Sequence, residues 1–554
     1  MPPASRKDAH PDIQIGFPVL PGPLSQIRVD LFKQWLQACD QYHPICHRDY
    51  GRFRDYSQRD SEEEALSRLP TRVIDIDFGT NLRLKDFSNV DRYNEDVRYI
   101  TLSHCWGKLP DERKRQYCLT TDNINQRFND GFSIAELPKT FRDAITMTHR
   151  LGIRYLWIDS LCIIQYGDNL ADWRKEAVRM ETVFRNAYCT IAATAAKDSD
   201  TGFLPHDSDT QRASTSSTSS PGYLSLHSLH GPVHISPVAD DFETDVNNGL
   251  LNTRAWVLQE RALSARTIHF TTSQAYFECG HGVRCETLTR MQNSKNLFLS
   301  DPDFPRSLRL RAGRDRVLLF QDLFKTYSRL GITVPTDKSL AIAGLEKRLA
   351  EVFGTRCCFG VVERYLHRSL LWERSREEKQ RRENNKGSVG RITYPEGSEV
   401  PSWSWMAWER GVDYLDIDTQ GVEWDQDVSL AEDGKTLRAR VRRFSKSCRT
   451  ERNDSCSVVV FEDGAKRGDS GWIRFDRKRR VHLRKHRCVV VGREETSYRP
   501  GLLARSRDGW DYYVLVVAQV EIGGRRVFER IGVGCIPVGC ISFRGSERVT
   551  DTIV

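Results

Sequence analysis

Three short apolar segments decide the fold: YITLS at residues 99–103, YLWI at 155–158 and CTIAAT at 189–194. Each has the length and composition of a buried strand. An amphipathic segment that can begin after Pro138 and end at Gly152 separates the first two, and another precedes the third. This alternation predicts parallel strands with helices as crossovers. In such sheets ligands bind outside the carboxyl ends of the strands, so the residues that follow each strand are the first candidates for a site.

The first strand ends in the motif Ser103-His104-Cys105-Trp106-Gly107. Gly107 permits a tight turn, and Trp106 offers a flat surface on which a ring can stack. The Cys-His pair has the composition of a nucleophile and its base, but neighbours on an extended strand point to opposite faces. Packing is therefore the favoured interpretation of Cys105. Ser103, Trp106 and Gly107 remain as candidate ligand-binding residues.

Two acidic residues follow the second strand. Asp159 comes directly after it, where a carboxylate can bind ribose hydroxyls or a base, or can cap the next helix. Glu176 stands three residues after Trp173, so the two share a helical face. A carboxylate partly desolvated beside Trp suits general acid/base or electrostatic work. The alternative for Glu176 is a surface position favoured by the helix N-terminus.

A third motif, NTRAWVLQER at 252–261, places Gln259 and Glu260 on one helical face with Arg254 near its start. A fixed Arg beside Gln and Glu can clamp a phosphate or a carboxylate. The same residues can equally form an internal salt-bridge network that holds this helix to the rest of the domain.

One further pattern has the composition of half a zinc site. Cys39, His43 and Cys46 follow the spacing C-x3-H-x2-C, but no second pair follows nearby, so we expect no metal. No glycine-rich phosphate loop accompanies the first strand. The N-terminus lacks a hydrophobic signal core, so secretion is not expected and the 15 cysteines are predicted to be reduced thiols.

Composition argues against a wholly disordered chain and against a chain with a membrane-spanning helix. With 39% hydrophobic residues the 554-residue chain can bury a core, and no apolar run reaches the roughly 18 residues of a membrane helix.

The net charge of +8 comes from residues 438–487, where basic residues outnumber acidic ones by 11 and leave −3 for the rest. Such a segment can bind nucleic acid or form a solvated face, and the absence of a nucleic-acid-binding signature favours the second. We expect a cytoplasmic protein without a membrane span, or a nuclear one if the basic run at 477–480 acts as an address.

The motifs together resemble a known family. YITLSHCWG, then YLWIDSLCIIQ with DWRKEAVRMETVFRNAYCTIAATAA, then LNTRAWVLQERALSARTIHF are similar in order and spacing to the three blocks of the fungal heterokaryon incompatibility (HET) domain. The resemblance covers about residues 99–263. WLQACDQYHPIC before this region, and DKSLAIAGLEKRL, VPSWSWMAWERG and FERIGVG after it, also look like pieces of HET-family proteins.

The resemblance implies a fungal protein of non-self recognition, an effector of growth arrest or cell death when incompatible cells fuse. The HET domain is in turn distantly similar to the TIR domain, which implies a TIR-like, flavodoxin-like parallel-sheet core. Some TIR domains cleave NAD with a Glu preceded by Trp at the spacing of Trp173 and Glu176. By this analogy Glu176 and Asp159 are the catalytic candidates, with Trp106 stacking on a ring.

Two other functions stay open. The HET core could signal by self-association, or through an incompatibility partner protein, without chemistry. The chain could also bind nucleic acid through residues 438–487. NAD enters only as a substrate of the first hypothesis, and no cofactor is assigned.

The expected organisation has five parts. An N-terminal arm with a helix and strands spans residues 1–98, and the HET domain spans 99–263 with a flexible insertion at 207–222. An α-rich connecting region follows at 264–372, then a charged linker at 373–400. A β-rich, partly basic region at 401–554 ends the chain.

Overall fold

The computed structural model describes residues 20, 22, 24–43, 46, 69–77, 79–87, 97–204, 224–228, 231–235, 240–291, 308, 311–375, 390–417, 421–454, 456–463, 470–477, 482–495, 509–543 and 551–554. Two compact units divide the chain, Met1–Ser307 and Leu308–Val554. The insertion expected at 207–222 and residues 376–389 of the linker expected at 373–400 lie outside the described residues. In the described part of the chain, no helix combines the length and the apolar character needed to cross a membrane.

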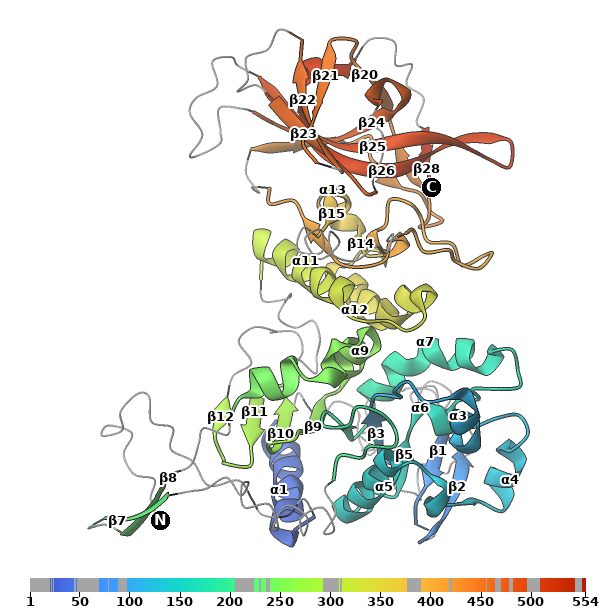
Figure 1. The fold of residues 1–554 in the computed structure, drawn as a ribbon, viewed down its shortest axis with the longest axis vertical. Coiled ribbons are helices and arrows are strands. Elements are labelled where there is room, and N and C mark those ends of the chain that lie inside the picture. The colour runs from blue at the N-terminus through green and yellow to red at the C-terminus, as the bar shows by residue number, and fades with distance from the viewer. Residues whose placement is uncertain are drawn as a thin grey trace, which may run out of the picture. The chain divides into compact units, whose positions relative to one another are not determined.

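The N-terminal unit is built on a ten-stranded sheet in the order β12-β11-β10-β9-β6-β3-β5-β1-β2-β4 (Figure 1). Its strands are β1 (Arg72–Asp75), β2 (Asn81–Asp86), β3 (Tyr99–Ser103), β4 (Phe132–Ser133), β5 (Tyr155–Trp157), β6 (Cys189–Ala192), β9 (Arg266–Phe270), β10 (Ala275–Cys279), β11 (Gly282–Cys285) and β12 (Arg290–Met291). A separate hairpin joins β7 (Leu224–Ser228) to β8 (Gly231–Ile235).

The centre of this sheet is parallel. Strand β3 pairs in parallel with β5 and with β6, and β6 pairs in parallel with β9. The three strands predicted around residues 99–194 and their parallel pairing are therefore confirmed. The remaining pairs of the sheet are antiparallel, so the whole sheet is mixed rather than parallel. Residues 266–291 continue the same sheet as strands, where the sequence predicts an α-rich region, because β9 is held by β6 rather than by the segment after it.

Helices provide the crossovers between the parallel strands. The helix α5 (Lys139–Leu151) starts after Pro138 and ends at Gly152, whose φ of 79° is the left-handed conformation that glycine adopts without strain. The unit also contains α1 (Gln26–Tyr42), α3 (Asp111–Tyr117), α4 (Ile124–Asn129), α6 (Asp159–Cys162), α7 (Ala171–Arg185), α9 (Ala255–Leu263) and short turns at Ile134–Glu136, Glu243–Asn247 and Leu250–Thr253.

In its described residues, the C-terminal unit combines α-helices with a twelve-stranded sheet (Figure 1). Its helices are α11 (Arg314–Arg329), α12 (Ala343–Phe353) and α13 (Leu366–Leu370). The strands of the large sheet are β17 (Val422–Trp424), β18 (Ser429–Leu430), β19 (Leu437–Ala439), β20 (Val441–Phe444), β21 (Cys448–Arg452), β22 (Ser457–Glu462), β23 (Ser470–Phe475), β24 (Arg487–Glu495), β25 (Trp510–Ile522), β26 (Arg525–Pro537), β27 (Ile541–Ser542) and β28 (Asp551–Ile553). Two-stranded pairs join β13 (Cys357–Cys358) to β14 (Val361–Val362) and β15 (Trp372–Arg374) to β16 (Val412–Tyr414). The remaining short turns are Pro335–Lys338, Leu340–Ile342, Glu363–Tyr365, Trp405–Ala407, Leu483–Lys485 and Val538–Cys540.

Both faces of the large sheet are buried. Leu515 and Val517 of β25 belong to one apolar core, and Val514 and Val516 of the same strand belong to another. Alternation along a strand puts consecutive side chains on opposite faces, so β25 is a central strand covered on both sides. The basic segment at 438–487 supplies β20, which pairs with β24 and β27, and the consecutive strands β21, β22 and β23. Several of its arginines pair with carboxylates, as Arg440 does with Asp427 at 2.9 Å.

Candidate functional site at the carboxyl ends of the parallel strands

The end of β3 is joined to α9 by a short hydrogen bond. Ser103 is the last residue of β3, and its Oγ donates to Oε2 of Glu260 at 2.5 Å. Glu260 comes from the third sequence motif, so two segments far apart in the chain meet at this edge of the sheet. Arg254, at the start of α9, lies beside them and donates from Nη1 to the carbonyl oxygen of His104 at 2.6 Å.

A second bond joins the first motif to the residue after β5. The indole Nε1 of Trp106 donates to Oδ2 of Asp159 at 2.8 Å. The other carboxylate oxygen, Oδ1, accepts the backbone N–H of Ser160 at 2.7 Å at the start of α6. Asp159 is the first residue of α6 rather than its N-cap, and its carboxylate holds the Trp106 ring. Binding of ribose hydroxyls or a base by Asp159 stays a prediction.

Gly107 allows the turn after Trp106. Its φ is +74°, and a Cβ at this position would lie 2.2 Å from Cβ of Asp198. A side chain is thus excluded by both backbone conformation and space. The tight turn expected at Gly107 is present, and Asp198 is the group that approaches its backbone.

The Glu260 carboxyl is held in an environment that disfavours its charge. Desolvation raises its pKa to about 7, and the negative charge of Asp159 acts in the same direction. The bond from Ser103 and the charge of Arg254 oppose the shift without cancelling it. A carboxyl with a pKa near neutrality can donate or accept a proton at physiological pH.

Two buried polar atoms beside this network have no hydrogen-bond partner among the described residues. They are Nε2 of His104 and Oγ of Ser160, whose residues are 5% and 0% exposed. Burial lowers the pKa of His104 to about 4, so its imidazole is neutral at physiological pH. An unmade hydrogen bond of this kind costs about 1–3 kcal/mol, and a polar ligand or a water molecule would remove that cost.

Glu176 lies at the same edge of the sheet but has other partners. It is 4% exposed on α7, and its Oε1 accepts from Oγ1 of Thr71 at 2.7 Å and lies 3.6 Å from Nη1 of Arg179. Strand β1 runs antiparallel to β5, with Ile74 opposite Leu156, so Thr71 just before β1 stands near the carboxyl end of β5. The described hydrogen bonds of Glu176 do not join it to the Ser103–Glu260 pair.

Trp173 connects α7 to α9. Its ring packs edge-on against Trp256 with centroids 6.2 Å apart. Gln259 is 3% exposed on α9 and is engaged by other groups of the protein. The two helices that carry Glu176 and Glu260 are therefore packed together, while the two carboxyls have separate hydrogen-bond partners.

The first, second and third motifs thus form one constellation around the parallel strands, and this is also where a family comparison matches. The family model described as "Heterokaryon incompatibility protein (HET)" covers residues 99–260. The chain contains a HET domain. No curated protein and no solved structure matches the chain.

A buried ionic cluster near the end of the HET domain was missed by sequence reasoning. Arg261 donates from Nε and Nη2 to the two carboxylate oxygens of Glu278 at 2.7 and 2.9 Å, and His269 Nε2 lies 3.0 Å from Glu278 Oε2. These charges hold the pKa of Glu278 far below its usual range, despite burial. Neither spacing nor periodicity relates Arg261 to Glu278, because β9 and a turn separate them. This ion pair is not the network predicted from Arg254, Gln259 and Glu260, since Arg261 and Glu278 form it.

Cys105 lies in an apolar environment. It packs with Ala192, Leu251 and Val257, and burial raises the pKa of its thiol. A raised pKa lowers the fraction of thiolate, so Cys105 is unsuited to nucleophilic attack. The packing interpretation of this cysteine in the HET motif agrees with the structure.

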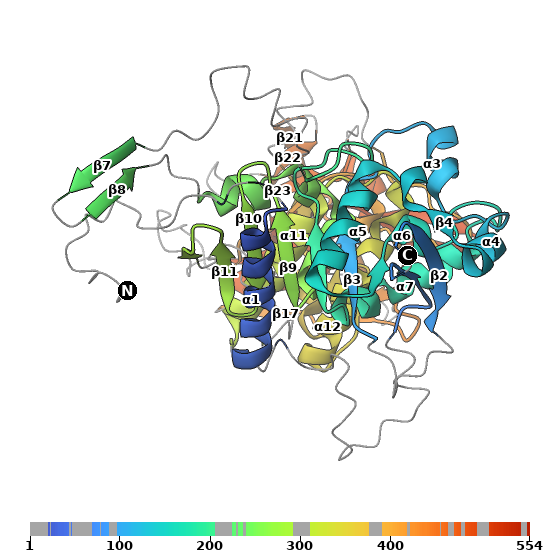
Figure 2. The same ribbon diagram turned by 90° about the horizontal axis from the view of Figure 1, so that it is seen from below.

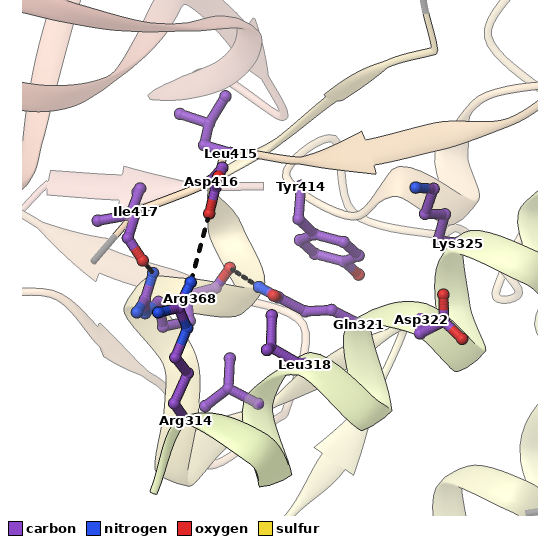
Figure 3. A pocket seen from close by; sticks show the side chains of 11 residues that line it. Arg314, Leu318, Gln321, Asp322, Lys325, Arg368, Tyr414, Leu415, Asp416 and Ile417 are labelled. Atoms are coloured by element: carbon purple, nitrogen blue, oxygen red, sulfur yellow. Dashed lines mark hydrogen bonds and ion pairs between the residues drawn. The ribbon is translucent and has the colours of Figure 1, made fainter. Parts of the chain in front are cut away.

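A pocket outside the HET domain lies within the C-terminal unit (Figure 3). Its polar lining groups bond to each other: Gln321 Nε2 donates to the carbonyl of Arg368 at 3.3 Å, and Arg368 donates to the carbonyl of Ile417 at 2.6 Å. Arg314 approaches Asp416 at 3.9 Å. None of the residues that the sequence marked for chemistry lines this pocket, and we assign it no function.

Proposed function

We propose that this chain is an effector of heterokaryon incompatibility whose HET domain cleaves the nicotinamide–ribose bond of NAD or a related nucleotide. One observation carries the proposal. The Ser103–Glu260 and Trp106–Asp159 pairs stand at the carboxyl ends of neighbouring parallel strands, with unpartnered buried polar atoms among the described residues beside them. This is the edge of an α/β sheet at which nucleotides bind.

The strand order supports a TIR-like or flavodoxin-like interpretation of the core. Taken in chain order, the four parallel strands β3, β5, β6 and β9 lie in the spatial order second, first, third, fourth. Flavodoxin-like sheets begin with the same order, and their ligand binds where the order reverses, between the first and third strands. In this chain those strands are β3 and β6, and Ser103 and Trp106 follow the first of them. This support is analogy at the level of topology.

Each residue of the site has a role in the proposed reaction. Glu176 would stabilise the oxocarbenium-like centre that forms as nicotinamide leaves, as carboxylates do in glycoside cleavage. Asp159 would hold the ribose hydroxyls, and Trp106 would present its ring to the base. Glu260, with its pKa of about 7, would exchange a proton with the attacking water or with the ribose. Arg254, Gln259 and Ser103 would hold the carboxyls and the phosphate end of the ligand in place.

The direct test is nucleotide profiling after induced expression of the full chain in a host cell. Wild type is expected to arrest growth and to deplete NAD, and Glu176→Gln is expected to lose both effects, because the amide can still accept the bond from Thr71 but carries no charge. Glu181→Gln, a buried carboxyl on the same helix that is outside the site, is the matched control and should behave as wild type.

A non-enzymatic signalling module is the second candidate, and one observation favours it. Glu176 is already engaged by Thr71 and Arg179, as a purely structural carboxylate would be. Growth arrest by wild type with unchanged NAD, retained in Glu176→Gln, would overturn the enzymatic proposal in favour of signalling by assembly.

A further inference from the structure

A cluster of three thiols and one imidazole lies at the junction of α1 and β10. Cys39, His43, Cys46 and Cys279 each present one ligand atom, and these four atoms all lie within 4.8 Å of one another. The side chains are 0%, 7%, 1% and 4% exposed, so the cluster is closed to solvent. It lies outside the proposed nucleotide site and shares no residue with it.

Local structure turns the three N-terminal side chains toward one point. Cys39 is in the last turn of α1, and the backbone N–H of His43 donates to the carbonyl of Cys39 at 3.1 Å as the helix ends. The N–H of Cys46 then donates to the carbonyl of His43 at 2.9 Å, which continues the turn. The spacing C-x3-H-x2-C is thus the spacing of one helical turn followed by one tight turn.

The fourth side chain comes from the sheet. Cys279 is the last residue of β10, and α1 lies beside that strand (Figures 1 and 2). Its Sγ is 3.5 Å from Nδ1 of His43. The ring of His281, in the turn after β10, stacks on the ring of His43 with centroids 3.9 Å apart and an interplanar angle of 13°, which fixes the orientation of the imidazole.

The 3.5 Å between Cys279 Sγ and His43 Nδ1 is the separation of two ligands on one tetrahedral metal ion, and all four ligand atoms are close enough to share such an ion. Zinc binds thiolate sulfur at about 2.3 Å and imidazole nitrogen at about 2.0–2.1 Å, so a sulfur and a nitrogen on one tetrahedral zinc stand about 3.6 Å apart and two sulfurs about 3.8 Å apart. A disulfide would engage only two of the four groups and would leave a buried thiol and an imidazole beside it. Thiolate-rich donor sets exclude calcium and magnesium and are typical of zinc.

We infer that Cys39, His43, Cys46 and Cys279 form a structural zinc site of the Cys3His type. Four protein ligands leave no open position, so the ion does not take part in catalysis. Three thiolates and a neutral imidazole around Zn²⁺ carry a net charge of −1. The guanidinium of Arg266, which donates from Nη2 to the carbonyl of Cys46 at 3.3 Å and pairs with Asp40 at 2.6 Å, lies beside that charge. The site fastens the helix that precedes the HET domain to a strand that follows it.

The test is the metal content of the purified full-length chain, prepared without chelator and measured by inductively coupled plasma mass spectrometry. Wild type is expected to contain one zinc per chain. Cys279→Ser and His43→Phe should lose it, and His43→Cys should retain it because a fourth thiolate replaces the imidazole. Cys189→Ser, a buried thiol on β6 of the same sheet, is the matched control and should keep its zinc.

A second measurement on wild type alone guards against variants that fail to fold. Cobalt exchanged into the site should give the intense thiolate charge-transfer bands and the ligand-field bands of a tetrahedral Co²⁺ centre. Zinc-free wild type that takes up no cobalt, or a disulfide between any two of these cysteines in the folded chain, would overturn the inference. Neither result depends on whether the HET domain cleaves a nucleotide.

Discussion

Two neighbouring residues of α9, Glu260 and Arg261, take part in two carboxyl environments that differ sharply. Glu278 faces Arg261 at the end of α9 and is matched by a bidentate guanidinium and an imidazole. Glu260, the residue before Arg261, accepts one hydrogen bond from the Ser103 hydroxyl and has its pKa raised to about 7. In the first arrangement both carboxylate oxygens of Glu278 have charged or hydrogen-bonding partners within the protein. The second leaves a titratable carboxyl beside unpartnered polar atoms of the described region, a combination that is commoner at functional sites than elsewhere in proteins.

The largest loss of stability is expected when the cluster of Arg261, His269 and Glu278 loses its guanidinium. Arg261→Met should leave Glu278 as a buried charge without its guanidinium partner and destabilise the N-terminal unit by about 3–5 kcal/mol. Thermal unfolding of the full chain measures this. Arg113→Met, which removes an exposed pair with Asp200, is the control and should cost at most about 1 kcal/mol. Equal losses of stability in Arg261→Met and Arg113→Met would show that the buried Arg261–Glu278 pair is worth no more than an exposed one.

The stability difference between Glu260→Gln and wild type should grow from about pH 4.5 to about pH 7 and stay constant above that. In wild type the folded carboxyl keeps its proton up to a pKa of about 7, against 4.5 as its ordinary value, so its contribution to stability is present below about pH 4.5 and is lost as pH rises through 7. The glutamine carries no such loss. At pH 8 the variant should gain about 1–3 kcal/mol on wild type, and at pH 4.5 the two should be nearly equal. A difference independent of pH would show that Glu260 is not desolvated.

The turn after Trp106 offers a comparison of two glycines with similar backbone conformation. Gly107→Ala should cost about 2 kcal/mol more than Gly152→Ala, because both have positive φ but only a Cβ at 107 would meet Asp198. Unfolding midpoints of the two variants provide the measurement. If the two alanines cost the same, the close approach between Gly107 and Asp198 does not constrain the site.

The smallest change in stability is expected from loss of the hydrogen bond between Trp106 and Asp159. Trp106→Phe keeps a ring but removes the donor to Asp159, and should cost about 1 kcal/mol. A double-mutant cycle with Asp159→Asn isolates the coupling between the two residues. A coupling of zero would mean that the bond does not hold the ring.

The sequence was most informative where the pattern was local. Strand β3 has the predicted bounds, and α5 begins after the predicted Pro138 and ends at the predicted Gly152. Such bounds depend on the apolar pattern and on the Pro and Gly residues within a few positions of the element. The antiparallel strands after residue 264 were not predicted, because their place is set by pairing with β6 and not by their own composition.

In the candidate site, too, local motifs could be predicted from the sequence and contacts between distant segments could not. The motifs around Ser103, Asp159 and Glu260 were recognisable from residue types at strand and helix ends. The pairing of Ser103 with Glu260 was not recognisable, since it joins segments that only the fold brings together. The same holds for Cys279, which completes a pattern of which the sequence near Cys39 offers three members.

The central claim is that the carboxyl-end rim of the HET domain cleaves a nucleotide, and release of nicotinamide from NAD by the purified full-length chain tests it most directly. We predict release by wild type and by Glu181→Gln, and loss of release in Glu176→Gln and Asp159→Asn that remain folded. No release by folded wild type, or equal release by all four proteins, would contradict it.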